Sequence, residues 1–142
     1  MAVVGMKFKL KDPMIVSARV KGKNGRVREL STLLDYNSHF CWILRKDGVD
    51  LGYPEVINRP EDYEAVAMNR TPHVISARGL ELGILATLSE VALGDLVAKN
   101  VDAIALKLDM ALMLPVDLIL GRTFLNNFKM EIDPKEGYLS LT

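Results

Sequence analysis

Turn-forming residues divide this chain into short apolar segments, and this division constrains its fold more than any other feature of the sequence. Residues 6–10 alternate apolar and polar side chains strictly, a period of two that is typical of a strand with one buried face. Two further strand-like segments, 15–21 and 26–34, lie on either side of Asn24-Gly25. Asn-Gly between two such segments is a strong hairpin signal, because both residues tolerate positive φ.

The rest of the chain continues this pattern. Further strands are predicted, among others at 40–44, 74–77, 84–93, 96–108, 118–120 and 138–141. Phe124, Leu125 and Phe128 are spaced as on one face of a helix, which predicts a short helix over residues 122–128. About seven to nine strands with one short helix predict a mostly β chain, closed as a barrel or stacked as a sandwich.

Two segments are less regular. Residues 46–51 are predicted to form a short helix or turn, and residues 53–73, interrupted by three prolines, a long surface excursion. The chain has 142 residues, of which 49% are hydrophobic and 25% charged. This length and composition predict one globular domain over residues 1–142.

Charge and cysteine content exclude several classes of protein. Lys plus Arg and Asp plus Glu both number 18, which argues against a strongly basic nucleic-acid surface. No window of about 18 apolar residues predicts a membrane span, and no signal peptide is recognisable. Cys41 is the single cysteine, which fits a reducing compartment, so a cytoplasmic location is expected. Cys41 lies between Phe40 and Trp42 and is predicted to be a core residue. His39 and His73 lack ligand spacing, so no metal and no cofactor are predicted.

One carboxylate stands out by its position. The apolar run that ends at Leu34 is followed by Asp35, a turn and a second apolar run. Such an arrangement holds a carboxylate at a site, although an ordinary turn has the same pattern. Asp109 also follows an apolar run, but no turn residue comes after it. Asp133 precedes Pro134 and is interpreted as a turn carboxylate.

The order of these segments resembles the retropepsin-like (retroviral-type) aspartic peptidases. In that family an apolar pair precedes a catalytic Asp-Thr/Ser-Gly, a flap hairpin follows, and a hydrophobic-hydrophobic-Gly segment opens a helix near the C-terminus. Here residues 33–35 match the first motif, and residues 118–128 match the last. The resemblance implies a closed acid-protease barrel with one short C-terminal helix.

The resemblance also implies a set of site residues, each at a position that matches the family's motif. Asp35 is the implied catalytic residue. The other implied residues are the active-site loop Tyr36, Asn37 and Ser38, the flap candidates Ala77, Arg78 and Gly79, and the supporting residues Ile119, Leu120 and Gly121. Gly79 and Gly83 also fit plain turn glycines.

Two residues depart from the family pattern. Tyr36 stands where the family has Thr or Ser, whose small hydroxyl braces the two active-site loops against each other. A tyrosine hydroxyl lies too far along its ring to copy that brace. Asn37 stands where the family has Gly, and Asn is the next most tolerant residue for positive φ, so the tight turn is expected to survive.

The chemistry of such a site needs two carboxylates that share one proton. This chain supplies one, so the resemblance implies a homodimer with one Asp35 from each copy. The implied function is an aspartic endopeptidase that acts on peptide or unfolded protein, without nucleic-acid or membrane partners. The alternative is a catalytically inactive retropepsin-like module that binds peptides or serves assembly.

Overall fold

The computed structural model describes residues 5–53, 73–76, 79–106 and 116–142. Its elements, in chain order, are β1 (Met6–Lys9), β2 (Ile15–Lys21), β3 (Val27–Leu34), β4 (Cys41–Leu44), α1 (Arg45–Asp50), β5 (His73–Ser76), β6 (Gly79–Leu93), β7 (Leu96–Leu106), β8 (Leu118–Leu120), α3 (Arg122–Leu125), β9 (Met130–Asp133) and β10 (Tyr138–Leu141). The chain is mostly β, as its sequence predicts.

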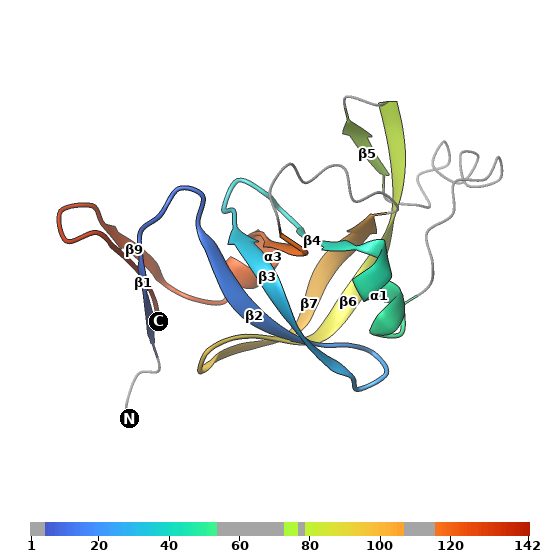
Figure 1. The fold of residues 1–142 in the computed structure, drawn as a ribbon, viewed down its shortest axis with the longest axis horizontal. Coiled ribbons are helices and arrows are strands. Elements are labelled where there is room, and N and C mark those ends of the chain that lie inside the picture. The colour runs from blue at the N-terminus through green and yellow to red at the C-terminus, as the bar shows by residue number, and fades with distance from the viewer. Residues whose placement is uncertain (1–4, 54–72, 77–78, 107–115) are drawn as a thin grey trace.

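Six of these strands close a barrel in the order β2-β3-β8-β4-β7-β6, and pairing between β2 and β6 joins the two ends of the sheet (Figure 1). The β2–β3 hairpin forms where Asn24-Gly25 predicts it, with Lys21 opposite Val27. Gly25 has a positive φ of 83°. Asn24 does not have a positive φ, and its side chain supports the turn by accepting a hydrogen bond from the Arg26 N–H. The predicted acid-protease barrel is therefore confirmed.

The core fills the inside of this barrel with alternating strand residues. Leu30, Ile43 and Leu118 are among its largest fully buried side chains, and Phe124 of α3 is buried with them. Helix α3 therefore packs on the barrel through its apolar residues, as the spacing of Phe124 and Leu125 predicts.

Strand β8 lies between β3 and β4, which follow each other in the chain but are not neighbours in the sheet. It runs parallel to β3, with Leu34 opposite Leu120, and antiparallel to β4. Parallel strands end at the same edge of a sheet. The residues that follow them, Asp35 and Gly121, are therefore brought together although they are far apart in sequence.

A separate three-stranded sheet, the terminal sheet, has the order β1-β10-β9 (Figure 1). Met6 lies opposite Leu141, and Phe8 lies opposite Leu139. These side chains belong to the core or pack against it. The two ends of the described chain are thus neighbours in one sheet.

Several predicted boundaries differ from the structure. The described residues form ten strands rather than about seven to nine. The predicted C-terminal helix is shorter, Arg122–Leu125, and a second helix, α1, forms in the segment predicted as a helix or turn. The excursion predicted at residues 53–73 lies almost wholly outside the described residues. None of the described residues belongs to a helix long and apolar enough to cross a membrane.

Candidate active site

The loop from Asp35 to Phe40 joins β3 to β4 across the end of β8. The Asp35 N–H donates to the Leu120 carbonyl at 3.0 Å, which anchors the start of the loop to β8. The Ser38 N–H donates to the Asp35 carbonyl at 3.2 Å and closes a tight turn. Asp35 is partly exposed, so its carboxylate can be reached from solvent.

The Asp35 carboxylate takes part in its own turn. Its Oδ1 accepts a hydrogen bond of 3.1 Å from the Asn37 N–H. Asn37 is not among the residues with positive φ, so the expected left-handed conformation is absent. The reason is that the Asp35 side chain makes the turn in place of an unusual backbone angle. The tight turn survives, as expected, and it brings a backbone N–H to the carboxylate.

Gly121 lets the chain after β8 pass close beneath this loop. A Cβ at this position would lie 2.5 Å from the Ser38 carbonyl oxygen and 2.2 Å from that of Phe40. Just beyond, the Arg122 N–H donates to the same Ser38 carbonyl at 2.8 Å. Leu120 is buried and Ile119 half-buried beside the loop. The structure thus brings the predicted supporting residues Ile119, Leu120 and Gly121 next to the loop that holds Asp35.

A hydroxyl that sequence reasoning missed ties this region to the neighbouring strands β4 and β7. Thr123 Oγ1 donates to the Asp102 carbonyl of β7 at 2.7 Å and accepts from the Cys41 N–H at 3.2 Å. Thr123 also donates its own N–H to the His39 carbonyl at 3.0 Å. A Thr at the start of a helix is a common capping signal, but its partners on β4 and β7 are set by the tertiary fold.

Two other loop side chains have defined partners. The Ser38 hydroxyl accepts a hydrogen bond from the Trp42 indole N–H. Cys41 is fully buried, and burial raises the pKa of its thiol. A buried thiol of raised pKa is a poor nucleophile, which supports the interpretation of Cys41 as a core residue.

Tyr36 points outward from the loop and is 53% exposed. The guanidinium carbon of Arg122 lies 5.8 Å from the centre of its ring, within the range of a cation–π contact. Arg122 Nε is buried and has no hydrogen-bond partner among the residues that the structure describes. The loop side chain that departs most from the family pattern therefore pairs with an arginine in its own chain.

The flap prediction falls on the β5–β6 hairpin. Strand β6 begins at Gly79, which pairs with Ser76, so Gly79 and Gly83 are strand residues rather than turn residues. Ala77 and Arg78, the other two predicted flap residues, lie outside the described residues. Figure 1 shows β5 and the first part of β6 projecting beyond the barrel, the position that a flap requires.

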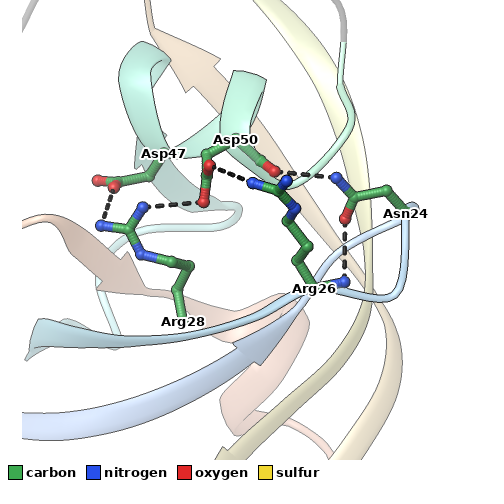
Figure 2. Close-up of polar contacts among 5 residues, drawn as sticks. All are labelled: Asn24, Arg26, Arg28, Asp47 and Asp50. Atoms are coloured by element: carbon green, nitrogen blue, oxygen red, sulfur yellow. Dashed lines mark hydrogen bonds and ion pairs between the residues drawn. The ribbon is translucent and has the colours of Figure 1, made fainter.

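A cluster of charged side chains fixes α1 to the β2–β3 hairpin (Figure 2). Arg28 contacts Asp50 at 2.9 Å and Asp47 at 3.3 Å, and Arg26 contacts Asp50 at 3.0 Å. Asp47 is buried, and its Oδ2 has no hydrogen-bond partner within the described part of the chain. Burial, with the negative charge of Asp117 adding to it, raises the pKa of the Asp47 carboxyl.

No group of three or more His, Cys, Asp or Glu side chains that could hold a metal ion is found among the described residues.

Comparisons with known proteins agree with this geometry at the level of fold. No protein-family model matches the sequence, and no curated protein matches it. Among solved structures, the chain is similar to the crystal structure of a retropepsin-like aspartic protease from Rickettsia conorii. The TM-score is 0.64 over 99% of this chain and 100% of that chain, at 18% sequence identity. This chain has the retropepsin-like fold that its sequence resembles.

Proposed function

We propose that this chain is an aspartic endopeptidase that acts as a homodimer on peptide or unfolded protein, with Asp35 of each copy forming the catalytic pair. The observation that supports this most is the position of Asp35. Asp35 is partly exposed, its carboxylate accepts a hydrogen bond from a backbone N–H at 3.1 Å, and it lies on a loop anchored to β8 and held over Gly121. A solved protein of the same fold is an aspartic protease.

The reaction follows from the chemistry of two adjacent carboxylates. Like charges a few Å apart do not both ionise readily, so one carboxyl keeps a proton while the other acts as base. The ionised carboxylate takes a proton from water as the water oxygen bonds to the peptide carbonyl carbon. The protonated carboxyl gives its proton to the carbonyl oxygen. The C–N bond of the resulting intermediate then breaks as the nitrogen takes a proton from one carboxyl, and a hydroxyl of the intermediate returns a proton to the other carboxylate as the new C=O bond forms.

Substitution of Asp35 tests this proposal. Wild-type protein is incubated with an unstructured polypeptide between about pH 3 and pH 7. Cleavage is expected in the wild type and is expected to be lost in Asp35→Asn. Asp95→Asn, a change of an exposed turn carboxylate remote in sequence from the loop, is the matched control and is expected to cleave normally. Equal cleavage by wild type and Asp35→Asn would contradict the proposal.

A second candidate function, peptide binding without hydrolysis, is favoured by Tyr36. Its ring points outward and pairs with Arg122, so it supplies no hydroxyl brace within the loop. On this alternative a peptide is held beside the projecting β5–β6 hairpin as an added strand. This alternative would be favoured if the wild type cleaves no peptide and Asp35→Ala still binds peptide. Absence of binding to a broad peptide panel would count against it.

A further inference from the structure

We propose that the Tyr36 ring and the Arg122 guanidinium form the contact through which two copies of this chain hold their Asp35 loops together. The inference rests on the proposed function and deepens it, since it names the residues that make the complete site. Tyr36 and Arg122 are positioning residues here. They take the place of the small hydroxyl that this chain lacks.

Tyr36 directly follows Asp35 in the chain, which limits how far it can lie from the contact between the two loops. For two Asp35 carboxylates to share a proton, the two loops must approach to within hydrogen-bond distance of each other. Consecutive Cα atoms are only about 3.8 Å apart, so the residue after Asp35 cannot lie far from that contact. In a two-fold dimer the same patch of each copy meets its equivalent. Tyr36 therefore lies at or beside the place where the copies meet.

Tyr36 is 53% exposed in the single chain, an amount of apolar ring surface that a partner can cover. Tyrosine is enriched among the residues that dominate interface affinity, because it buries a large rigid surface with few rotatable bonds. A second copy is the occupant that the half-site itself requires, since one chain supplies one Asp35 carboxylate.

Arg122 holds the Tyr36 ring in a defined place. Its backbone N–H is bonded to the Ser38 carbonyl at 2.8 Å, at the end of the same turn. Its guanidinium carbon is 5.8 Å from the centre of the Tyr36 ring. Its Nε is already out of water in the single chain. Arg122 is thus held to the loop through its backbone, and desolvation by a second copy would strengthen the cation–π contact.

The experiment measures dimerisation by sedimentation equilibrium without substrate, so its readout does not depend on cleavage. Wild type is expected to dimerise. Tyr36→Ala is expected to raise the dimer dissociation constant by about tenfold or more, the effect of removing an interface hot spot. Tyr36→Phe keeps the ring and is expected to stay within about threefold of wild type, because the ring rather than the hydroxyl makes the contact.

Two further variants keep the test interpretable. Arg122→Met keeps the unbranched stem, loses the cation, and is expected to weaken the dimer in the same direction as Tyr36→Ala. It also provides a second reading if Tyr36→Ala does not fold by circular dichroism. Val27→Ala removes an apolar side chain of similar exposure, 57%, from the outer end of β3 and is expected to leave dimerisation unchanged.

The outcomes separate this inference from the proposed function. A wild type that is monomeric at micromolar concentration overturns the inference. A Tyr36→Ala variant that dimerises like the wild type also overturns it. If that variant only raises KM, Tyr36 contacts the substrate instead. A wild-type dimer that depends on the Tyr36 ring but cleaves nothing supports the inference while the proposed peptidase activity fails.

Discussion

Gly121 is the residue at which the backbone after β8 comes closest to the loop that holds Asp35. The carbonyl oxygens of Ser38 and Phe40 occupy the space that any side chain at Gly121 would need. Both carbonyls belong to main chain that is bonded in place: the Ser38 carbonyl accepts from Arg122, and Cys41, after Phe40, begins β4. Relief of the overlap must therefore move the loop itself.

Gly121→Ala is accordingly expected to lower the free energy of unfolding by about 1–3 kcal/mol or more, the usual effect of overpacking against a fixed backbone. Gly48→Ala is the matched control. Its Cβ would only contact Ala105 at an ordinary 3.5 Å, inside helix α1. The control is expected to be neutral or stabilising by up to about 1 kcal/mol. Urea denaturation of both variants measures the difference, and equal effects would contradict the assigned role of Gly121.

The Thr123 hydroxyl has a similar structural importance, for a different reason. It satisfies the Cys41 N–H and the Asp102 carbonyl together. Thr123→Val keeps the shape and leaves these two groups unpaired, so a loss of about 1–3 kcal/mol of unfolding free energy is expected. Thr123→Ser keeps the hydroxyl and is expected to lose less. If Val and Ser are equally tolerated in thermal or urea unfolding, the hydroxyl does not hold these elements together.

At the residue scale, the sequence locates Asp35 and its supporting segment but not how the turn is made. Asn37 is expected to be left-handed because sequence reasoning considers backbone tolerance alone, whereas the Asp35 side chain makes the turn. The Thr123 hydroxyl is bonded to Cys41 of β4 and Asp102 of β7, and both residues are far from Thr123 in the sequence. No local pattern records such distances.

Helix α1 is the element whose position depends most on charge. Arg28 and Arg26 of the β2–β3 hairpin pair with Asp50, and the Asn24 side chain donates to the Asp50 carbonyl at 2.9 Å. Gly22 brings the hairpin against Leu51 at the end of the helix, where a Cβ would lie 2.3 Å from the Leu51 carbonyl oxygen. Helix and hairpin are therefore joined by both packing and ion pairs.

Asp47 and Asp50 of α1 are expected to change the free energy of unfolding with pH in opposite directions. Burial raises the pKa of Asp47, so its contribution is fully present below its unfolded pKa and is lost as pH rises through its folded pKa. The hydrogen bond from Arg28 lowers the pKa of Asp50, so its contribution is present above the unfolded pKa and is lost as pH falls through the folded pKa.

Asp47→Asn is expected to flatten the fall in unfolding free energy that the wild type shows as pH rises above about 4, the ordinary pKa of an aspartate. Asp50→Asn is expected to reduce the loss of stability on the acid side instead. Urea denaturation between about pH 3 and pH 8 covers both windows. A wild-type slope above pH 4 that survives in Asp47→Asn would contradict the assignment to Asp47.

At the element scale, local chemistry predicts the strands and, with less exact bounds, the short helix after Gly121. The β2–β3 hairpin follows from Asn24-Gly25, and the paired ends of β9 and β10 from the turn between them. Residues 45–50 have no helical period of apolar side chains, so the sequence leaves a helix and a turn both open there, and the contacts of α1 with the hairpin are found only in the structure. Strand β8 has three residues, too few to reveal a period, and its order between β3 and β4 is a property of the whole sheet.

For the whole molecule, the proposed site depends on protein concentration, because each copy supplies one Asp35. Peptidase activity per mole of protein is expected to fall on dilution below the dissociation constant of the proposed dimer. Added Asp35→Asn protein is expected to inhibit the wild type by forming mixed dimers with one carboxylate, whereas an equal amount of an unrelated protein is not. Activity that stays proportional to concentration and unaffected by Asp35→Asn would contradict a shared site.

The barrel as a whole is predictable from the sequence only through the resemblance of its segments to a known order. Alternation and turn signals predict β structure but leave a barrel and a sandwich equally open. The residues that settle the choice are Arg19 to Lys21, which pair with Glu90 to Ala92 and so close the sheet. Nothing in either segment alone indicates this pairing.

The place of β8 between β3 and β4 also affects the order in which the protein can be completed. Leu34 and Leu120 are neighbours in the sheet, but more than half of the 142-residue chain lies between them. Closing so long a loop is slow and entropically costly. A ribosome-bound chain that has just finished β7 therefore holds Asp35 with neither its Leu120 anchor nor the Gly121 turn beneath it. The Asp35 loop therefore cannot reach its folded arrangement until β8 has been made, long after β3.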